Sequence, residues 1–138
     1  MNTAQAQDEN ALREAIESKQ FVFLARSASP LRGSQVNLTT GYDIRVKGDS
    51  LVSVLPFYGR AHAPMVHPGG GIRFTSTDFT YKMEGKKKGW NIRIQPNDNR
   101  DVRELFLTVS KNGFATLQVT QLNRDAITFY GTVEKIKL

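Results

Sequence analysis

The spacing of apolar residues changes once along the chain, at about residue 20. Before this point, Leu12 and Ile16 lie four residues apart, a spacing that places both side chains on one face of a helix. Asp8 and Glu9 precede them, and acidic residues are favoured in the first turn of a helix. The pattern therefore predicts one short amphipathic helix over Asp8–Lys19, with its apolar face docked on a sheet.

After this helix, apolar and polar residues alternate in short runs separated by turns rich in glycine and asparagine. Such alternation is typical of antiparallel strands with one buried face. Turns at Lys47–Ser50, Gly85–Gly89 and Asn112–Gly113 predict three successive hairpins. We therefore expect an α+β fold, in which the N-terminal helix packs on a predominantly antiparallel β-sheet of about seven to nine strands, or on two packed sheets.

Length and composition are those of one globular domain. The chain has 138 residues, 39% of them apolar, and no cysteine. We expect residues 1–10 to be a disordered N-terminal segment and residues 11–138 to form a single domain. No run approaches the roughly 18 apolar residues of a membrane span, so we expect no transmembrane segment. The lack of cysteine excludes a thiol nucleophile, an iron–sulfur centre and cysteine-based zinc sites.

Positive charge is concentrated in one part of the sequence. The formal net charge is +6, and residues 82–103 hold seven basic residues against three acidic ones. This segment predicts a cationic face that attracts an anionic partner, while the alternative is a solvated hairpin without a partner. Residues 111–119 are similar to an RNA-binding strand but lack the aromatic residues that stack on bases, so nucleic acid is not favoured.

The stretch Pro56–Gly71 is the one long irregular segment, with three prolines, four glycines and both histidines. Long loops in a compact domain are often functional. Aromatic rings and a guanidinium in such a loop can contact a ligand, and the lysines of the second hairpin can attract its negative charge. The candidate ligand or partner surface is therefore Phe57, Tyr58, Arg60, His62 and His67 of this loop with Lys86, Lys87 and Lys88.

The residue patterns of common catalytic and metal sites are incomplete. His62 and His67 are five residues apart, and a zinc site would need two further ligands that the sequence does not identify. The G-x-S-x-G turn that presents the serine of many hydrolases does not occur. We therefore predict no catalytic residue, no metal and no cofactor. A hydrolase that uses His62 or His67 is kept as an alternative.

Five ordered motifs resemble one bacterial protein family. They are LPFYGRAHAP at Leu55–Pro64, GGGIRF at Gly69–Phe74, KKKGW at Lys86–Trp90, LTVSKNGFATL at Leu107–Leu117 and ITFYG at Ile127–Gly131. With these motifs the chain resembles the domain of unknown function 4251 family, over about Ala11–Gly131. The resemblance implies an exported, often lipoprotein-type protein of Bacteroidetes, and it implies no activity or cofactor. It therefore predicts a periplasmic or outer-membrane-associated location, whereas Met1 as the natural start would indicate the cytoplasm.

Together with the resemblance, these patterns favour a non-enzymatic cell-envelope domain that binds an extracytoplasmic ligand or a partner protein. The positive charge favours an anionic ligand, such as a glycan, a cell-wall fragment or a lipid headgroup. A purely structural or inhibitory protein-interaction module is a further alternative. Such a module would present a contiguous apolar patch.

Overall fold

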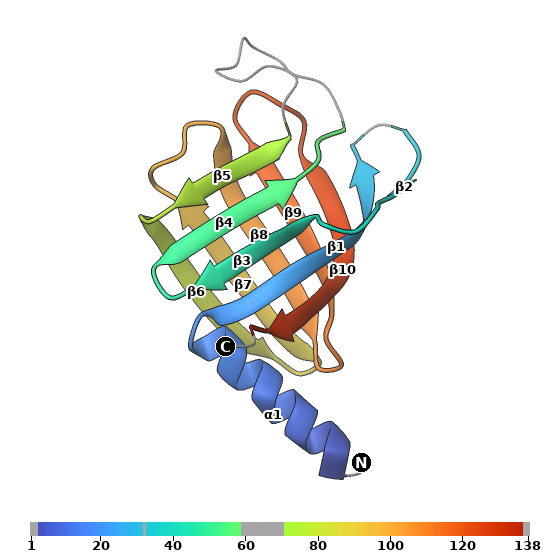
Figure 1. Cartoon of the computed structure of the whole chain (residues 1–138), viewed down its shortest axis with the longest axis vertical. Helices are drawn as coiled ribbons and strands as arrows, with labels where there is room; N and C mark the ends of the chain where they lie inside the picture. Colours follow the sequence, from blue (N-terminus) through green and yellow to red (C-terminus); the bar gives the residue numbers. More distant parts are fainter. Residues whose placement is uncertain (1–2, 32, 59–70, 137–138) are drawn as a thin grey trace.

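The computed structural model describes residues 3–31, 33–58 and 71–136, and within these ranges the chain is mainly β-strand (Figure 1). One helix, α1 (Thr3–Glu17), precedes ten strands. The strands are β1 (Gln20–Pro30), β2 (Val36–Asn37), β3 (Asp43–Lys47), β4 (Ser50–Leu55), β5 (Ile72–Ser76), β6 (Phe79–Lys86), β7 (Gly89–Pro96), β8 (Val102–Ser110), β9 (Phe114–Gln121) and β10 (Ile127–Lys135).

The strands form one antiparallel sheet in the order β5-β4-β3-β1-β10-β9-β8-β7-β6, with the short β2 paired to β1. The sheet curls until its two halves face each other, and it forms a half-barrel (Figure 1). β1 and β10 pair with each other and join the two halves. The edge strands β5 and β6 follow each other in sequence but are not paired.

The predicted α+β class is wrong, because the domain is mostly β. The structure does contain an N-terminal helix and an antiparallel sheet, but the 15-residue helix lies at one end of the sheet and leaves its faces uncovered (Figure 1). The two halves of the sheet bury their inner faces against each other instead. The sheet therefore packs mainly against itself. In an α+β domain, helices would cover one of its faces.

The core lies between the two halves of the sheet and follows the alternation of the sequence. Phe21 and Phe23 of β1 and Phe129 of β10 are each at most 1% exposed. Leu51 of β4 and Ile92 of β7, which come from opposite halves, are fully buried in the same cluster. Burial of one such side chain contributes about 1.5–3 kcal/mol, so packing of these strands stabilises the curled sheet.

A β-bulge in β1 and a glycine in β10 lie side by side where the two halves join. The register of the β1–β10 pair shifts between Ala25 and Ser27, so Arg26 is an extra residue on β1. Gly131 approaches β1 so closely that a Cβ atom there would lie 1.8 Å from the carbonyl oxygen of Leu24. Only glycine fits this contact, and a bulge increases the local bend and twist of a strand.

The helix covers one end of the half-barrel, which we call the helix end. Leu12, Ala15 and Ile16 are its buried residues and pack on the core. The phenol of Tyr81 donates a 2.6 Å hydrogen bond to the backbone carbonyl of Ile16, and burial raises the pKa of this phenol. Lys19, with a φ of 57°, then turns the chain into β1. The opposite end, which we call the loop end, carries the β7–β8 and β9–β10 turns (Figure 1).

The helix is longer than the apolar spacing predicts. It begins at Thr3 instead of Asp8, so residues 3–10, predicted as part of a disordered segment, form its first turns. This segment contains alanine and glutamine, which have high helix propensity. The spacing of Leu12 and Ile16 therefore identified only the later part of the helix.

Candidate functional site

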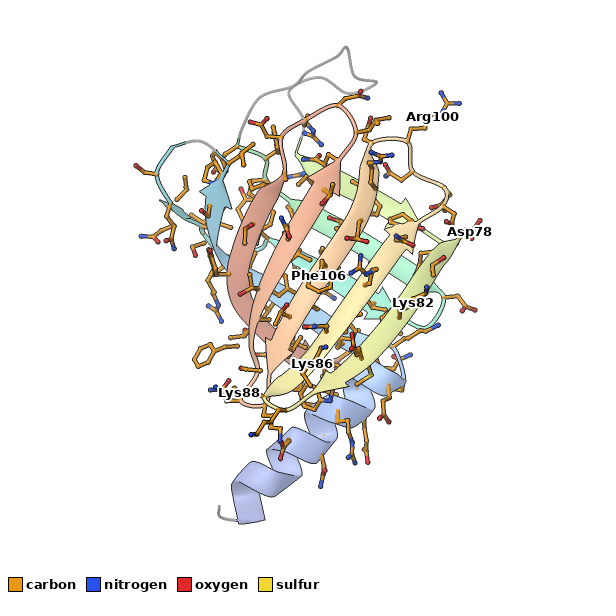
Figure 2. All side chains as sticks on the ribbon, turned by 180° about the vertical axis from the view of Figure 1, so that it is seen from behind. Asp78, Lys82, Lys86, Lys88, Arg100 and Phe106 are labelled. Carbon is orange, nitrogen blue, oxygen red and sulfur yellow. The ribbon has the colours of Figure 1, made fainter. Side chains whose placement is uncertain are left out.

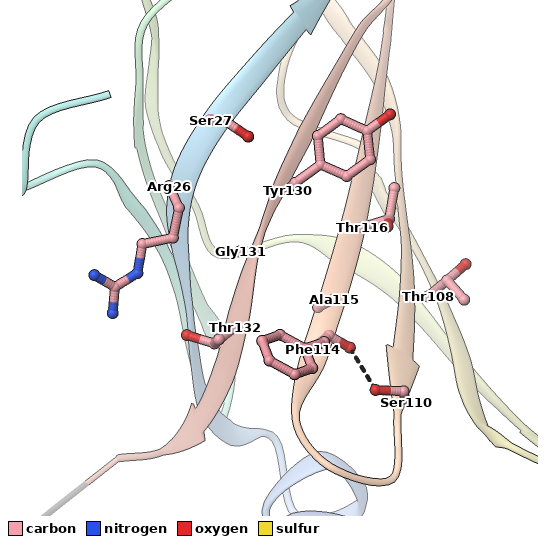
Figure 3. Close-up of a pocket in the computed structure, with 10 residues that line it drawn as sticks. All are labelled: Arg26, Ser27, Thr108, Ser110, Phe114, Ala115, Thr116, Tyr130, Gly131 and Thr132. Atoms are coloured by element: carbon pink, nitrogen blue, oxygen red, sulfur yellow. Dashed lines mark hydrogen bonds between the residues drawn. The ribbon is translucent and has the colours of Figure 1, made fainter. Parts of the chain in front are cut away.

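A hollow of about 700 Å³ opens to solvent on the outer face of the sheet, across β1, β10, β9 and β8 (Figure 3). We call it the outer hollow. Its lining combines two aromatic rings with hydroxyl groups and one arginine. The lining residues are Arg26, Ser27, Thr108, Ser110, Phe114, Ala115, Thr116, Tyr130, Gly131 and Thr132.

Two aromatic side chains are exposed in the outer hollow. Phe114 of β9 is 65% exposed and Tyr130 of β10 is 41% exposed. Phe114 is paired in register with Thr132, two residues from Tyr130, so the two rings are diagonal neighbours on one face. Gly131 lies between them along β10 (Figure 3), and a Cβ atom there would meet the backbone carbonyl of Leu24 on β1. A ligand that covers these rings removes apolar surface from water, which stabilises the complex.

Hydroxyl groups surround the two rings. Among the described residues, the side chains of Thr108 and Thr116, which pair across β8 and β9, make no hydrogen bond. The Oγ1 atom of Thr132 is buried and also lacks a partner in this part of the chain. Ser27 instead accepts a 2.9 Å hydrogen bond from the side chain of Gln35. Thr108 and Thr116 are therefore the hydroxyl groups that a ligand in the hollow can bond.

The charge in and beside the outer hollow is positive. Among the described residues, Arg26 is the one charged residue of the lining, and no carboxylate belongs to it. The basic hairpin Lys86–Lys88 lies beside the hollow, because Gly89, directly after the lysines, pairs with Ser110 of the lining. This arrangement favours an anionic ligand over a cationic one.

The basic residues of segment 82–103 are spread between the two ends of the half-barrel. Lys86 and Lys88 lie at the helix end, whereas Arg100 lies at the loop end (Figure 2). Lys86 also pairs with the carboxylate of Glu84 at 2.8 Å, which reduces its share of the positive potential. The positive charge of this segment therefore extends along the half-barrel, and the lysine hairpin is the part that borders the outer hollow.

The aromatic residues predicted for the site, Phe57 and Tyr58, follow β4 at the loop end, far from the lysine hairpin. The guanidinium of Arg124 lies 4.4 Å from the centre of the Phe57 ring and donates a 3.3 Å hydrogen bond to the carbonyl of Gly71. Tyr58 is 38% exposed. The structure thus does not bring these aromatic residues and the lysines together. Arg60, His62 and His67 lie outside the described residues.

Buried polar groups support the loop end around Arg124. Arg124 is 7% exposed, and burial lowers the pKa of its guanidinium while the negative charge of Asp101 opposes that shift. The side-chain amide of Gln121 donates a 2.9 Å hydrogen bond to the backbone carbonyl of Asp125, which is 3% exposed. Because these groups are buried among protein atoms, we assign them a structural role at the loop end.

Phe114, Tyr130 and Arg26 are not among the site residues that the sequence predicts. A signal exists for the two aromatic residues, since Phe114 and Tyr130 alternate with the buried positions Ala115 and Phe129. Alternation places such residues on the outer face, where an aromatic side chain is a candidate for ligand contact. No sequence signal marks Arg26, because a β-bulge depends on the partner strand.

The described ranges contain neither a metal-binding cluster nor a membrane-spanning helix. No group of three or more histidine, cysteine, aspartate or glutamate side chains there is arranged to hold a metal ion. No helix in the same ranges is long and apolar enough to cross a membrane. The described groups that a ligand in the outer hollow can contact are therefore aromatic rings, hydroxyl groups and one guanidinium.

The structure defines a mostly β domain, a curled antiparallel sheet with one helix at its end. The sequence profile of one family, described as a domain of unknown function (DUF4251), matches residues 3–133. The chain therefore belongs to the DUF4251 family, and the resemblance of its motifs to that family is confirmed. No curated protein matches the sequence.

The fold is also found in a crystal structure of a DUF4251 family protein from Bacteroides eggerthii DSM 20697. The two structures superpose with a TM-score of 0.72, and the match covers 96% of this chain and 90% of that one. The sequences are 20% identical. At this level of identity the similarity shows a shared fold.

Proposed function

We propose that this protein is a non-enzymatic binding domain of the cell envelope that binds a glycan in the outer hollow. The observation that carries the proposal is the exposure of Phe114 and Tyr130 on neighbouring strands, with hydroxyl groups around them. The envelope location is inferred from the family resemblance.

The lining matches the two kinds of surface that a sugar ring offers. A sugar ring has an apolar face of C–H groups, whose weakly positive hydrogens pack on the negative face of an aromatic ring. Its rim carries hydroxyl groups that donate and accept hydrogen bonds. Thr108 and Thr116 supply free hydroxyl groups beside the two rings, so stacking and hydrogen bonding can occur together.

A protein partner fits this lining less well. The cores of protein interfaces are enriched in aromatic residues and arginine but depleted in serine. The outer hollow contains Ser27 and Ser110 as well as three threonines, and each of its two aromatic residues is paired across the strands with a threonine. It therefore does not form the contiguous apolar patch that a structural or inhibitory module would present.

The lining also supports binding without catalysis. General acid and base catalysis needs a titratable side chain close to the reacting atoms, and glycoside hydrolysis uses a pair of carboxyl groups. In the part of the chain that the structure describes, no histidine, aspartate or glutamate lines the outer hollow. The hydrolase alternative depends on His62 or His67, which lie outside the described residues.

The test is the affinity of the purified protein for a panel of neutral and acidic oligosaccharides, measured by isothermal titration calorimetry. Phe114→Ala and Tyr130→Ala should each weaken binding roughly tenfold or more, because about 1.5–3 kcal/mol of apolar burial is lost. Leu122→Ala is the matched control, since Leu122 is 54% exposed but belongs to the β9–β10 turn at the loop end.

The control should bind as the wild type does, and circular dichroism should show that all three variants are folded. Binding that is equal in the wild type, Phe114→Ala and Tyr130→Ala would place the glycan elsewhere and reject the outer hollow. No binding of any glycan by the wild type would reject the proposed function itself.

A further inference from the structure

We propose that the glycan is acidic, and that Arg26 binds the carboxylate of a uronic acid residue at the rim of the outer hollow. This role of Arg26 rests on the proposed function, since it adds a charge requirement to a site built from aromatic rings and hydroxyl groups. It names the chemical class of the ligand, which the rings alone leave open.

The β-bulge explains why an arginine lies at this rim. Ser27 occupies the register position opposite Tyr130, and Ala25 occupies the one opposite Gly131, so Arg26 is added between them on the β1 side of the hollow. Its backbone carbonyl accepts a 2.9 Å hydrogen bond from the N–H of Leu38, which fixes the strand at this point. Bulges commonly redirect a side chain in this way.

The direction of the side chain restricts which part of a ligand it can meet. The guanidinium of Arg26 points away from the rings of Phe114 and Tyr130 (Figure 3). A sugar stacked on the two rings therefore cannot place its own ring on Arg26. A substituent at the edge of that sugar, or the next sugar of the chain, can reach the guanidinium.

The guanidinium of Arg26 is free to take an anionic partner. Among the described residues it makes no ion pair, whereas Arg45 on the same sheet pairs with Asp43 at 3.3 Å. The lysine hairpin Lys86–Lys88 borders the hollow from its other side, and it adds positive potential there. An anionic ligand thus meets positive charge at both borders of the hollow, and the described residues of the lining include no carboxylate.

A carboxylate suits this site better than a phosphate does. The planar fork of a guanidinium binds the two oxygens of a carboxylate with two parallel hydrogen bonds. A phosphate monoester carries about two negative charges and is usually held by several donors, such as a helix N-terminus. The described lining of the outer hollow consists of strand residues and offers one guanidinium.

The experiment compares uronic acid oligosaccharides with their carboxyl-reduced counterparts, in which each carboxylate has become a neutral hydroxymethyl group. Oligomers of galacturonate, mannuronate and glucuronate serve as probes, each beside its reduced form. Affinities are measured by titration calorimetry at low and high salt. The wild type should bind at least one acidic oligomer roughly ten- to a hundredfold more tightly than its reduced form, and high salt should reduce that preference.

Two variants then locate the charge. Arg26→Gln should remove the preference, so that the acidic oligomer and its reduced form bind this variant with equal affinity. Arg73→Gln removes the same charge from β5, at the far edge of the sheet, and should keep the preference. Phe114→Ala should lower the affinities for the acidic and the reduced oligomer by the same factor, because stacking on the ring does not depend on charge.

The outcomes separate this inference from the proposed function. Equal affinity of the wild type for acidic and reduced oligomers overturns the role of Arg26 and leaves glycan binding in place. A preference that survives in Arg26→Gln also overturns it and moves the charge recognition to other cations. If no acidic or reduced oligomer binds, and neutral glycans fail as well, both the proposed function and this inference are rejected.

Discussion

The buried hydroxyl of Ser76, at the end of β5, donates a hydrogen bond to the carboxylate of Asp98 in the β7–β8 turn. The backbone N–H of Thr77 donates to the other carboxylate oxygen at 3.1 Å. Ser76 and Thr77 lie at the corner through which the chain passes from β5 to β6, the two edges of the sheet that do not pair. Asp98 thus holds the corner that connects the two halves of the half-barrel at their open side.

The Ser76–Asp98 contact makes stability depend on acid pH. The hydrogen bond from Ser76, more than any other contact, holds the pKa of Asp98 below its ordinary value of 3.8. A carboxyl group with a lowered pKa in the folded state stabilises that state at pH values above the ordinary pKa, and this contribution is lost as the pH falls below it. The Tm of the wild type should therefore exceed that of Asp98→Asn near neutral pH, and the difference should shrink below about pH 3.8.

Thermal unfolding followed by circular dichroism from neutral to acid pH measures this difference. Asp49→Asn is the control, because Asp49 lies in the β3–β4 turn at the helix end and makes no side-chain hydrogen bond among the described residues. A Tm difference for Asp98→Asn that stays constant down to acid pH would contradict the role of its carboxylate.

Tyr81→Phe should loosen the attachment of the helix to β6. The substitution removes the 2.6 Å hydrogen bond to the carbonyl of Ile16 and leaves that carbonyl without this donor. The free energy of unfolding should fall by about 1 kcal/mol, measured by urea denaturation. Tyr130→Phe removes a phenol that makes no hydrogen bond among the described residues, so its stability should match the wild type. Equal stability of Tyr81→Phe and Tyr130→Phe would show that the hydrogen bond between Tyr81 and Ile16 does not stabilise the protein.

Gly131→Ala should strongly destabilise the sheet where its two halves join. The new Cβ atom would lie 1.8 Å from the carbonyl oxygen of Leu24, and backbone on both strands would have to move. A loss of at least about 2–3 kcal/mol is expected from urea denaturation. Gly85→Ala in β6 is the control, because its Cβ would meet no atom within 4 Å. A Gly131→Ala protein as stable as Gly85→Ala would show that the close approach of β10 to β1 is not required.

Arg124→Met should weaken the loop end and leave the outer hollow intact. The substitution removes the hydrogen bond to Gly71 and the stacking of a guanidinium on Phe57. Stability should fall by about 2–3 kcal/mol, since a buried charged donor is lost, while glycan affinity should be unchanged. Arg100→Met changes an exposed arginine at the same end and should alter neither quantity. Reduced glycan affinity in Arg124→Met would instead indicate that the loop end takes part in binding.

Local sequence signals were sufficient to predict a helix before residue 20, though not its first residue, and the three hairpins. Leu12 and Ile16 are buried as their spacing predicts, and the three predicted turns each connect two paired strands. The Asn112–Gly113 turn connects β8 to β9, with Gly113 at a φ of 93° that favours glycine. Helices and hairpin turns form through interactions between residues close together in the chain, so a short stretch of sequence is enough to predict them.

The fold class could not be obtained in the same way. Whether a sheet is covered by a helix or closes on its own inner face depends on how strands far apart in sequence pair. Here β1 pairs with β10, for example Phe23 with Val133. The residues of neither strand indicate which strand it pairs with. The bulge at Arg26 and the close approach at Gly131 arise from that pairing.

The candidate site shows the same division. The sequence determined which residues alternate outward, including Phe114 and Tyr130, and it determined the lysine hairpin with its positive charge. Only the tertiary structure decided that Phe57 and Tyr58 lie at the opposite end of the half-barrel from the lysine hairpin. It also decided that Arg26, Phe114 and Tyr130 line the same hollow. The physical reason is that alternation along a strand sets the face of a side chain, whereas its neighbours on that face are set by strand pairing and register.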